Sequence, residues 1–160
     1  MEITMVLHLP RDAASVPVSR QVLDGCLQTL GVTPDTRADI ALALSEACAN
    51  VVQHAGPGED YQVQVRAGSG TCAIEVVNAG KPVPNGSGPG AGPWPAATAE
   101  HGRGLKIINA VVDNLQLTGN ERQGTTVRFE KTLDWLPGAA GLHLFDPKDP
   151  KDPGDPGGAS

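Results

Sequence analysis

The alternation of apolar and polar residues divides most of this chain into short strands and two-sided helices. Residues 2–9 (EITMVLHL) alternate and predict a strand. Residues 61–67 and 72–78 also fit strands, and the Gly-Ser-Gly-Thr turn between them predicts an antiparallel hairpin. Two more strands are predicted over residues 115–118 and 124–131.

Helical spacing of apolar residues separates these strands. It runs over residues 15–30, where Gly31 is the expected end of the helix. A longer helix is predicted from Pro34 to about His54, and a third follows the Gly102–Gly104 segment. The order is strand, helix, helix, strand, strand, loop, helix, strand, strand. It predicts an α/β two-layer sandwich, in which three helices cover one face of a mixed, mostly antiparallel sheet.

Two stretches break the pattern. Residues 81–100 are mostly Gly, Pro, Ala and Ser without periodicity, and a loop of this length in a compact domain is functional or disordered. After residue 136, Asp-Pro steps recur with Lys or Gly between them. We therefore expect one domain over residues 1–136 and a disordered Gly/Pro/Asp-rich tail over residues 137–160. The alternative for Leu142, Leu144 and Phe145 is a short docking segment.

Charge and composition narrow the class of protein. The formal net charge of −6 argues against direct binding of nucleic acid, because an acidic domain repels phosphate backbones. No apolar run approaches the roughly 20 residues that cross a bilayer, and no signal peptide is evident, so we expect a cytoplasmic protein. Cys26, Cys48 and Cys72 are isolated and read as reduced core thiols, with zinc binding or thiol chemistry as the alternatives.

The segment ALALSEACANVVQHA carries the most informative pair of polar residues. Glu46 and Asn50 are four residues apart on the predicted helix, so both project from one face. The carboxylate can act as a general base, and the amide oxygen suits Mg²⁺. Such a pair is more often simply a solvated helix face.

Three other segments could hold a ligand. Asn78 ends a strand and can hydrogen-bond an exocyclic amine, and Gly80 lets the backbone approach a flat ring. The glycines in His-Gly-Arg-Gly-Leu start a helix, where free N–H groups and the helix dipole favour an anion. Thr125 could place a hydroxyl in a buried pocket. Each of these has an ordinary structural explanation when taken alone.

Together and in this order, these segments resemble the GHKL ATPase superfamily, and the short form resembles the bacterial anti-sigma-factor serine kinases. The resemblance covers about residues 1–133 and is strongest in SEACANVVQHA and HGRGL. It implies a Bergerat-type fold that binds ATP and Mg²⁺. Glu46 would be the catalytic base and Asn50 the Mg²⁺ ligand.

The resemblance assigns the remaining site residues too. It implies that Asn78 and Thr125 recognise the adenine through hydrogen bonds and that Gly80 packs on the adenine ring. It also implies that residues 81–100 form a lid over the nucleotide, with His101 at the hinge of this lid. The phosphates would be wrapped by Gly102, Arg103, Gly104 and Leu105. Arg20 would lie on the partner-binding face. Asn78 stands where the family has Asp, and Pro82 where it has Gly.

The function that this resemblance implies is that of a serine kinase, which phosphorylates a STAS-type anti-anti-sigma protein and otherwise sequesters a sigma factor. A homodimer is also implied. The main alternative is a binding module without catalysis, which Asn78 and Pro82 favour. The catalytic half of a histidine kinase is disfavoured, because no dimerisation helix with a phosphorylatable His precedes the domain. A structural α/β domain with chance motifs is the last alternative.

Overall fold

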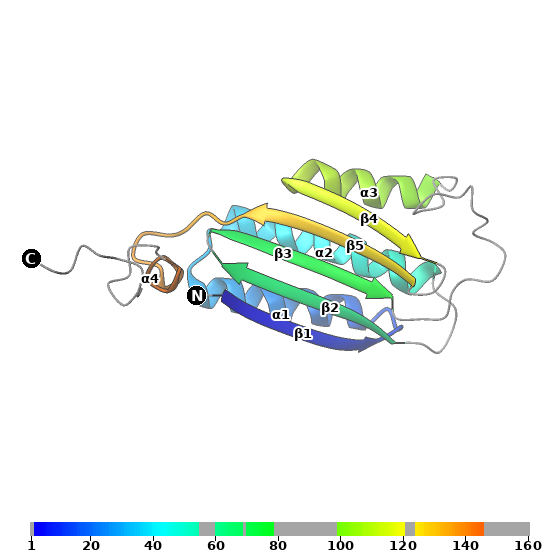
Figure 1. Cartoon of the computed structure of the whole chain (residues 1–160), viewed down its shortest axis with the longest axis horizontal. Coiled ribbons are helices and arrows are strands. Elements are labelled where there is room, and N and C mark those ends of the chain that lie inside the picture. Colours follow the sequence, from blue (N-terminus) through cyan, green and yellow to red (C-terminus); the bar gives the residue numbers. More distant parts are fainter. Residues whose placement is uncertain (1, 55–59, 69, 79–98, 121–123, 146–160) are drawn as a thin grey trace, which may run out of the picture.

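The computed structural model describes residues 2–54, 60–68, 70–78, 99–120 and 124–145. Figure 1 shows one sheet with helices stacked on one of its faces. The elements follow the predicted order, with one addition at the C-terminal end. They are β1 (Glu2–Pro10), α1 (Ser15–Leu30), α2 (Pro34–His54), β2 (Asp60–Gly68), β3 (Thr71–Asn78), α3 (Ala99–Val111), β4 (Asn114–Asn120), β5 (Gly124–Thr132) and α4 (Ala140–Leu144).

The sheet has five strands in the order β1-β2-β3-β5-β4. Every pairing in the described part of the chain is antiparallel, so the expectation of a mixed sheet is corrected. The connection through α3 makes β3 and β4 run in the same direction, but β5 pairs with both and lies between them. The parallel pair that a crossover helix usually creates is therefore not formed.

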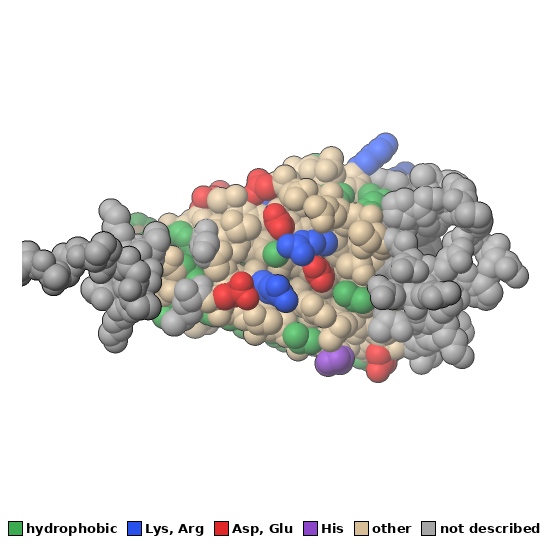
Figure 2. Space-filling view, in the orientation of Figure 1, with side chains coloured by type: hydrophobic (Ala, Val, Ile, Leu, Met, Phe, Trp, Pro, Cys, Tyr) green, Lys and Arg blue, Asp and Glu red, His purple; other side chains and the backbone are tan. Residues whose placement is uncertain are grey.

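The two faces of the sheet differ in polarity because side chains alternate along each strand. The inner face supplies buried residues to the core: Tyr61, Val63, Val65, Ile74, Val76, Val127 and Phe129. Charged side chains gather at the middle of the outer face (Figure 2). There, Arg128 donates to the carboxylates of Glu75 and Glu130, at 2.9 and 3.0 Å.

Helices α1, α2 and α3 lie side by side on the inner face, with α2 in the centre (Figure 1). The predicted end of α1 at Gly31 is confirmed. Gly31 adopts φ +90°, and its N–H donates to the carbonyl of Gln28. The N–H of Val32 donates to Leu27, and the buried side chains of these two residues complete the cap.

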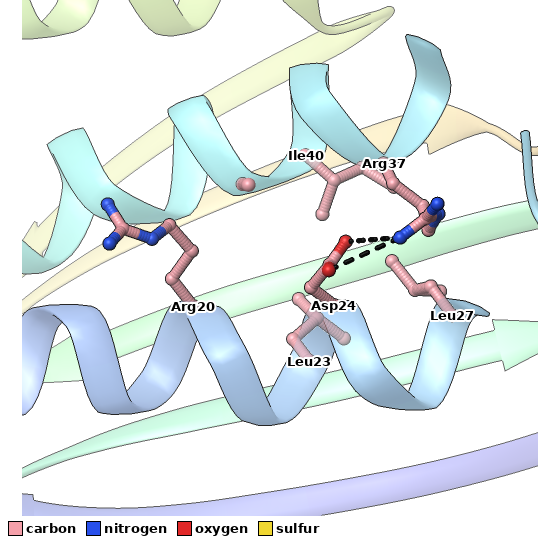
Figure 3. A pocket seen from close by; sticks show the side chains of 7 residues that line it. Arg20, Leu23, Asp24, Leu27, Arg37 and Ile40 are labelled. Atoms are coloured by element: carbon pink, nitrogen blue, oxygen red, sulfur yellow. Dashed lines mark hydrogen bonds and ion pairs between the residues drawn. The ribbon is translucent and has the colours of Figure 1, made fainter. Parts of the chain in front are cut away.

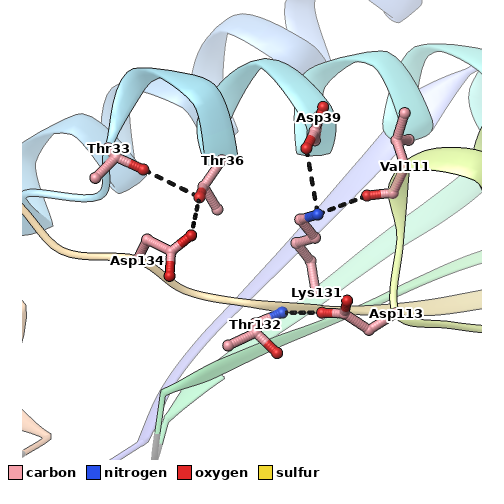
Figure 4. A network of polar contacts seen from close by, with 8 residues as sticks. All are labelled: Thr33, Thr36, Asp39, Val111, Asp113, Lys131, Thr132 and Asp134. Atoms are coloured by element: carbon pink, nitrogen blue, oxygen red, sulfur yellow. Dashed lines mark hydrogen bonds and ion pairs between the residues drawn. The ribbon is translucent and has the colours of Figure 1, made fainter.

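Polar contacts anchor one end of the helical layer, where α2 begins and α3 ends (Figure 4). Thr36, in the first turn of α2, donates to Asp134 at 3.1 Å. Lys131 of β5 contacts Asp39 of α2 at 3.2 Å and donates to the carbonyl of Val111 at 2.8 Å. A cation at the last turn of a helix also interacts favourably with the helix dipole. Lys131 therefore holds the end of α3 beside α2.

The ordered structure continues past the predicted boundary at residue 136. Residues 137–145 include α4, and Ala139 and Phe145 are buried. The ring of Phe145 lies 5.9 Å from that of Trp135, centroid to centroid, and Trp135 itself bridges to Val32. The predicted disorder is wrong for this part, because the side chains of Ala139 and Phe145 are buried at the end of the sandwich, with Phe145 beside Trp135. Residues 146–160 lie outside the described part.

Candidate functional site

The polar face of α2 is covered rather than solvated. Asn50 is buried, with 4% of its surface exposed, and Glu46 is half-buried one turn earlier. Helix α3 packs against this face, while α1 packs against the other side of α2. The alternative of a simple solvated face is therefore excluded for Asn50, and the shared orientation of the pair is consistent with their four-residue spacing.

Gly104 allows α3 to approach this pair closely. A Cβ atom built on Gly104 would lie 3.2 Å from Oε2 of Glu46 and 3.2 Å from both Oδ1 and Nδ2 of Asn50. These distances are shorter than almost all real Cβ contacts, so any side chain at this position would push the two polar groups. The glycine thus brings two helices and two functional groups together at one point.

The amide of Asn50 is the clearest sign of a binding site. Its Nδ2 atom is buried and has no hydrogen-bond partner among the described residues. Leaving a buried donor unsatisfied costs about 1–3 kcal/mol, and a bound ligand beside the helix would satisfy it. A half turn of the amide exchanges its nitrogen and oxygen, so the same end can offer an oxygen ligand.

A carboxylate and an amide oxygen suit Mg²⁺, which prefers oxygen ligands and usually takes only one or two from the protein. The described residues contain no cluster of three or more His, Cys, Asp or Glu side chains that could hold a metal alone. The Glu46–Asn50 pair offers two oxygen atoms that are chemically suited to such a cation.

The glycine-rich segment lies inside α3, not at its start. The helix begins at Ala99, three residues before Gly102, because Ala and Glu are good helix formers and extend it backwards. Gly102 is still among the first four residues, whose N–H groups have no partner within the helix. Arg103 is exposed, and Leu105 is partly buried and packs against the hydrophobic core.

Asn78 lies at the same end of the molecule as the second half of α2 and the start of α3 (Figure 1). It is the last residue of β3 and is buried, with 8% of its surface exposed. Its Oδ1 accepts a hydrogen bond from Nη2 of Arg11, in the segment after β1. Arg11 had no role in the sequence analysis, because nothing in its local pattern reveals a contact across 67 positions.

Buried polar side chains link β2 to α1 and α2. Tyr61 is the partner of Asn78 in the β2–β3 register, and its hydroxyl lies 2.6 Å from that of Ser15. The same hydroxyl contacts Cys48, two residues before Asn50, and burial raises the pKa of both groups. The pKa of Cys48 rises to about 11, so this thiol stays protonated and structural.

The other cysteines divide into a core and a surface position. Burial raises the pKa of Cys72 to about 12, which agrees with a core thiol. Cys26 is exposed on α1, contrary to expectation, and its sulfur lies 3.9 Å from that of Met5. The helical spacing of apolar residues placed Cys26 among the core residues of α1. In the structure, Cys26 lies on the side of α1 that faces solvent.

Several predicted site residues cannot be placed relative to the others. Gly80 and most of the predicted lid lie outside the described residues. The side chains of His101 and Thr125 also lie outside them, although their backbones belong to α3 and β5. Their assigned roles remain predictions.

Arg20 lies apart from Glu46 and Gly104. It is exposed on α1 and lines a shallow groove between α1 and α2, on the side of α2 away from α3 (Figure 3). In the same groove, Nη1 of Arg37 contacts the carboxylate of Asp24 at 3.1 Å. The two sets of residues therefore occupy different surfaces of one helical layer.

Comparisons with known proteins found matches in sequence and in structure. Residues 9–131 match the family described as the histidine kinase-like ATPase domain. The chain is 29% identical over 133 residues to the serine-protein kinase RsbW of Bacillus cereus, covering 78% of this chain and 82% of that protein. The RsbW protein of Bacillus anthracis matches to the same extent.

A solved structure supports the fold. The crystal structure of the RsbU and RsbW domains of Rv1364c from Mycobacterium tuberculosis matches with a TM-score of 0.62 at 20% identity. The match covers 82% of this chain but only 32% of that longer protein. The Bergerat-type sandwich expected from the sequence is thereby confirmed. Within the described residues, no helix is long and apolar enough to span a bilayer.

Proposed function

Because this chain belongs to the histidine kinase-like ATPase family, we propose that it binds MgATP and transfers the γ-phosphate to a protein serine. The acceptor is a STAS-type anti-anti-sigma protein, and the chain sequesters a sigma factor when that acceptor is absent. Similarity to the RsbW serine-protein kinases supports both parts of this proposal.

One observation carries the proposal. The unsatisfied amide of Asn50 is buried beside Glu46, at the point where Gly104 keeps the space between two helices free of a side chain. A purely structural helix contact would fill this space with apolar side chains. A carboxylate and an unpaired amide there are better explained by a polar ligand with which they interact.

Each of these residues has a chemical role in the proposed reaction. Glu46 accepts the proton of the attacking serine hydroxyl as a general base. Asn50 offers an oxygen ligand to Mg²⁺, which neutralises charge on the phosphates when it is bound. The free N–H of Gly102 donates to a phosphate oxygen at the positive end of α3. Arg20 contacts the protein partner, and the homodimer forms through the outer sheet face.

The proposal is tested by separating binding from transfer. Calorimetry measures MgATP binding, and radiolabelled ATP measures transfer to a STAS-domain protein from the same genome. Glu46→Gln is expected to keep MgATP affinity within a few-fold and to lower transfer at least about 100-fold, since general base catalysis contributes roughly 10²–10⁴. Unchanged transfer in Glu46→Gln would show that Glu46 is not the base.

Asn50→Ala tests the other half of the pair. We expect MgATP binding to weaken at least about tenfold, while the free energy of unfolding falls by less than ~1 kcal/mol, because the variant removes an unsatisfied buried donor. Asn109→Ala, on the exposed side of α3, is the matched control and should change neither quantity. A loss of stability without a loss of binding would make Asn50 a structural residue.

A binding module without catalysis is the second candidate. It is favoured by Asn78, whose acceptor oxygen already receives a hydrogen bond from Arg11. This candidate predicts that the wild-type chain binds its protein partners but transfers no phosphate to any STAS-domain protein.

A further inference from the structure

A buried thiol joins the second half of α2 to α1 and to β2. Cys48 is fully buried, and its sulfur lies 3.6 Å from the hydroxyl oxygen of Ser19 in α1. The thiol also forms a hydrogen bond with the hydroxyl of Tyr61 in β2. That hydroxyl is held in turn by the hydroxyl of Ser15, 2.6 Å away, and all four side chains are buried. One residue of α2 therefore has directional contacts with two other elements.

The chemistry of these groups assigns the donor in the contact between α2 and α1. Ser19 donates to the carbonyl of Val16 at 2.8 Å, which uses its one hydroxyl proton. The thiol of Cys48 is therefore the donor to Ser19. Burial raises the pKa of this thiol to about 11, so near neutral pH it keeps the proton that the contact needs.

This cluster lies far along α2 from the polar contacts that hold the start of the helix. Among the described residues, the other side-chain hydrogen bonds and ion pairs of α2 involve Thr36, Arg37 and Asp39. Apolar packing buries the rest of the helix, but the hydrophobic effect has no preferred direction. The hydrogen bonds of Cys48 therefore set the rotation of the second half of α2 about its axis.

This rotation also sets where Glu46 and Asn50 point, because they lie two residues before and two residues after Cys48. Side-chain ends lie roughly 5–6 Å from the axis of a helix, so a rotation of about 10° moves them by about 1 Å. Functional groups must be held within about 0.5 Å, and a misplacement of about 1 Å can cost about 100-fold in rate.

We propose that Cys48 is a positioning residue for phosphate transfer, because its contacts with α1 and β2 keep Glu46 and Asn50 turned towards Gly104 on α3. Cys48 acts through the rotation of α2. The inference rests on the proposed function and deepens it by naming the residue that aligns the general base.

The test compares two substitutions that remove the same sulfur atom. Cys48→Ala and Cys48→Ser leave similar space, but only serine keeps a hydrogen-bond donor. The assay measures transfer of labelled γ-phosphate from saturating MgATP to a STAS-domain protein, with the full chain as the kinase. We expect Cys48→Ala to lower the transfer rate about tenfold, and Cys48→Ser to stay within about threefold of wild type.

Cys72 offers the matched control for loss of a buried thiol. It is also fully buried, in β3, and its thiol has no hydrogen-bond partner among the described residues. Cys72→Ala should therefore transfer phosphate within about twofold of wild type, even where its stability falls.

A second measurement separates positioning from a general loss of folded protein. In Glu46→Gln the base is already absent, so adding Cys48→Ala should lower the residual transfer by less than about twofold. A loss of folded protein would instead lower the rate by the same factor in both backgrounds.

Three results would overturn the inference and leave the proposed function standing. They are equal transfer by Cys48→Ala and Cys48→Ser, equal losses in the wild-type and Glu46→Gln backgrounds, and a loss in Cys72→Ala as large as that in Cys48→Ala. Failure of the wild-type chain to transfer phosphate would instead overturn the proposed function, and this inference with it.

Discussion

Replacing Gly104 by alanine should separate stability from function in this protein. A single methyl group at this position would lie 3.2 Å from Oε2 of Glu46 and from both terminal atoms of Asn50. The change adds no charge and no hydrogen-bonding group. Any effect on ligand binding must therefore come from displacement of these two side chains by a few tenths of an ångström.

Two opposing terms set the expected change in stability. Alanine is about 1 kcal/mol more favourable than glycine inside a helix, and Gly104 lies within α3. Against this stands the crowding of Glu46 and Asn50, whose polar groups are the ends of side chains and can shift at modest cost. We expect Gly104→Ala to be as stable as wild type or up to ~1 kcal/mol more stable.

Gly25 offers the matched control for the helix term. It lies in α1, and a Cβ atom there would have nothing within 4 Å. Gly25→Ala should therefore show the full gain in stability, about 2–4 °C in melting temperature for a chain of this size. The difference between the two variants measures the crowding at Glu46 and Asn50.

Ligand binding should respond in the opposite direction. A shift of a few tenths of an ångström takes up much of the roughly 0.5 Å within which functional groups must be held, so we expect Gly104→Ala to weaken MgATP binding on the order of tenfold. Gly25→Ala should leave it unchanged. The assay is calorimetric titration with MgATP beside thermal unfolding of the same samples. If Gly104→Ala binds MgATP within twofold of wild type, the glycine does not protect the site and the proposed role of the α2–α3 contact is wrong.

Two further predictions concern stability. Gly141→Ala should lower the free energy of unfolding by about 1–3 kcal/mol, because the new Cβ would lie 2.0 Å from the ring of Trp135. Urea unfolding measures this free energy. As a control, Leu142→Ala replaces an exposed residue of the same helix and should lower the free energy of unfolding by less than about 0.5 kcal/mol. A Gly141→Ala protein as stable as wild type would show that α4 is not packed as described. Stability should also fall above pH 9, because burial raises the pKa of Cys48 and Cys72 from 9.0 to about 11 and about 12, and the unfolded chain loses these protons first. The loss in free energy of unfolding should reach about 1 kcal/mol per thiol by pH 10, and it should be halved in Cys72→Ala. The same pH dependence of stability in Cys72→Ala and in wild type would contradict this prediction.

Local sequence determined most of the elements. The helix over Ser15–Leu30 and its end at Gly31 follow from apolar spacing and from the one residue type that readily adopts a positive φ. The strands follow from alternation, and β1, β2 and β3 agree with their predicted ranges within one residue at each end. The shared face of Glu46 and Asn50 was also predictable, because four residues make about one helical turn.

The residue pattern of α2 does not predict which element packs over the face that carries Glu46 and Asn50. It depends on α3, about fifty positions later, and on a glycine whose importance appears only when two helices meet. In the same way, periodicity places Cys26 among core residues but does not say which side of α1 receives another element. Periodicity reports how far residues lie apart along one element, and it carries no information about the surface that will pack there.

The tertiary structure alone decided three features: the contact of Arg11 with Asn78, the all-antiparallel sheet, and the C-terminal cap around Trp135. Each depends on pairing between segments that are remote in sequence: β2 pairs with β1 and β3 and brings Arg11 to Asn78, and Trp135, after β5, pairs with Val32, between α1 and α2. Local spacing therefore specified which groups this protein carries on which face of each element. The packing of elements remote in sequence specified which of those groups meet, since buried polar contacts and close approaches form only where two surfaces exclude water together.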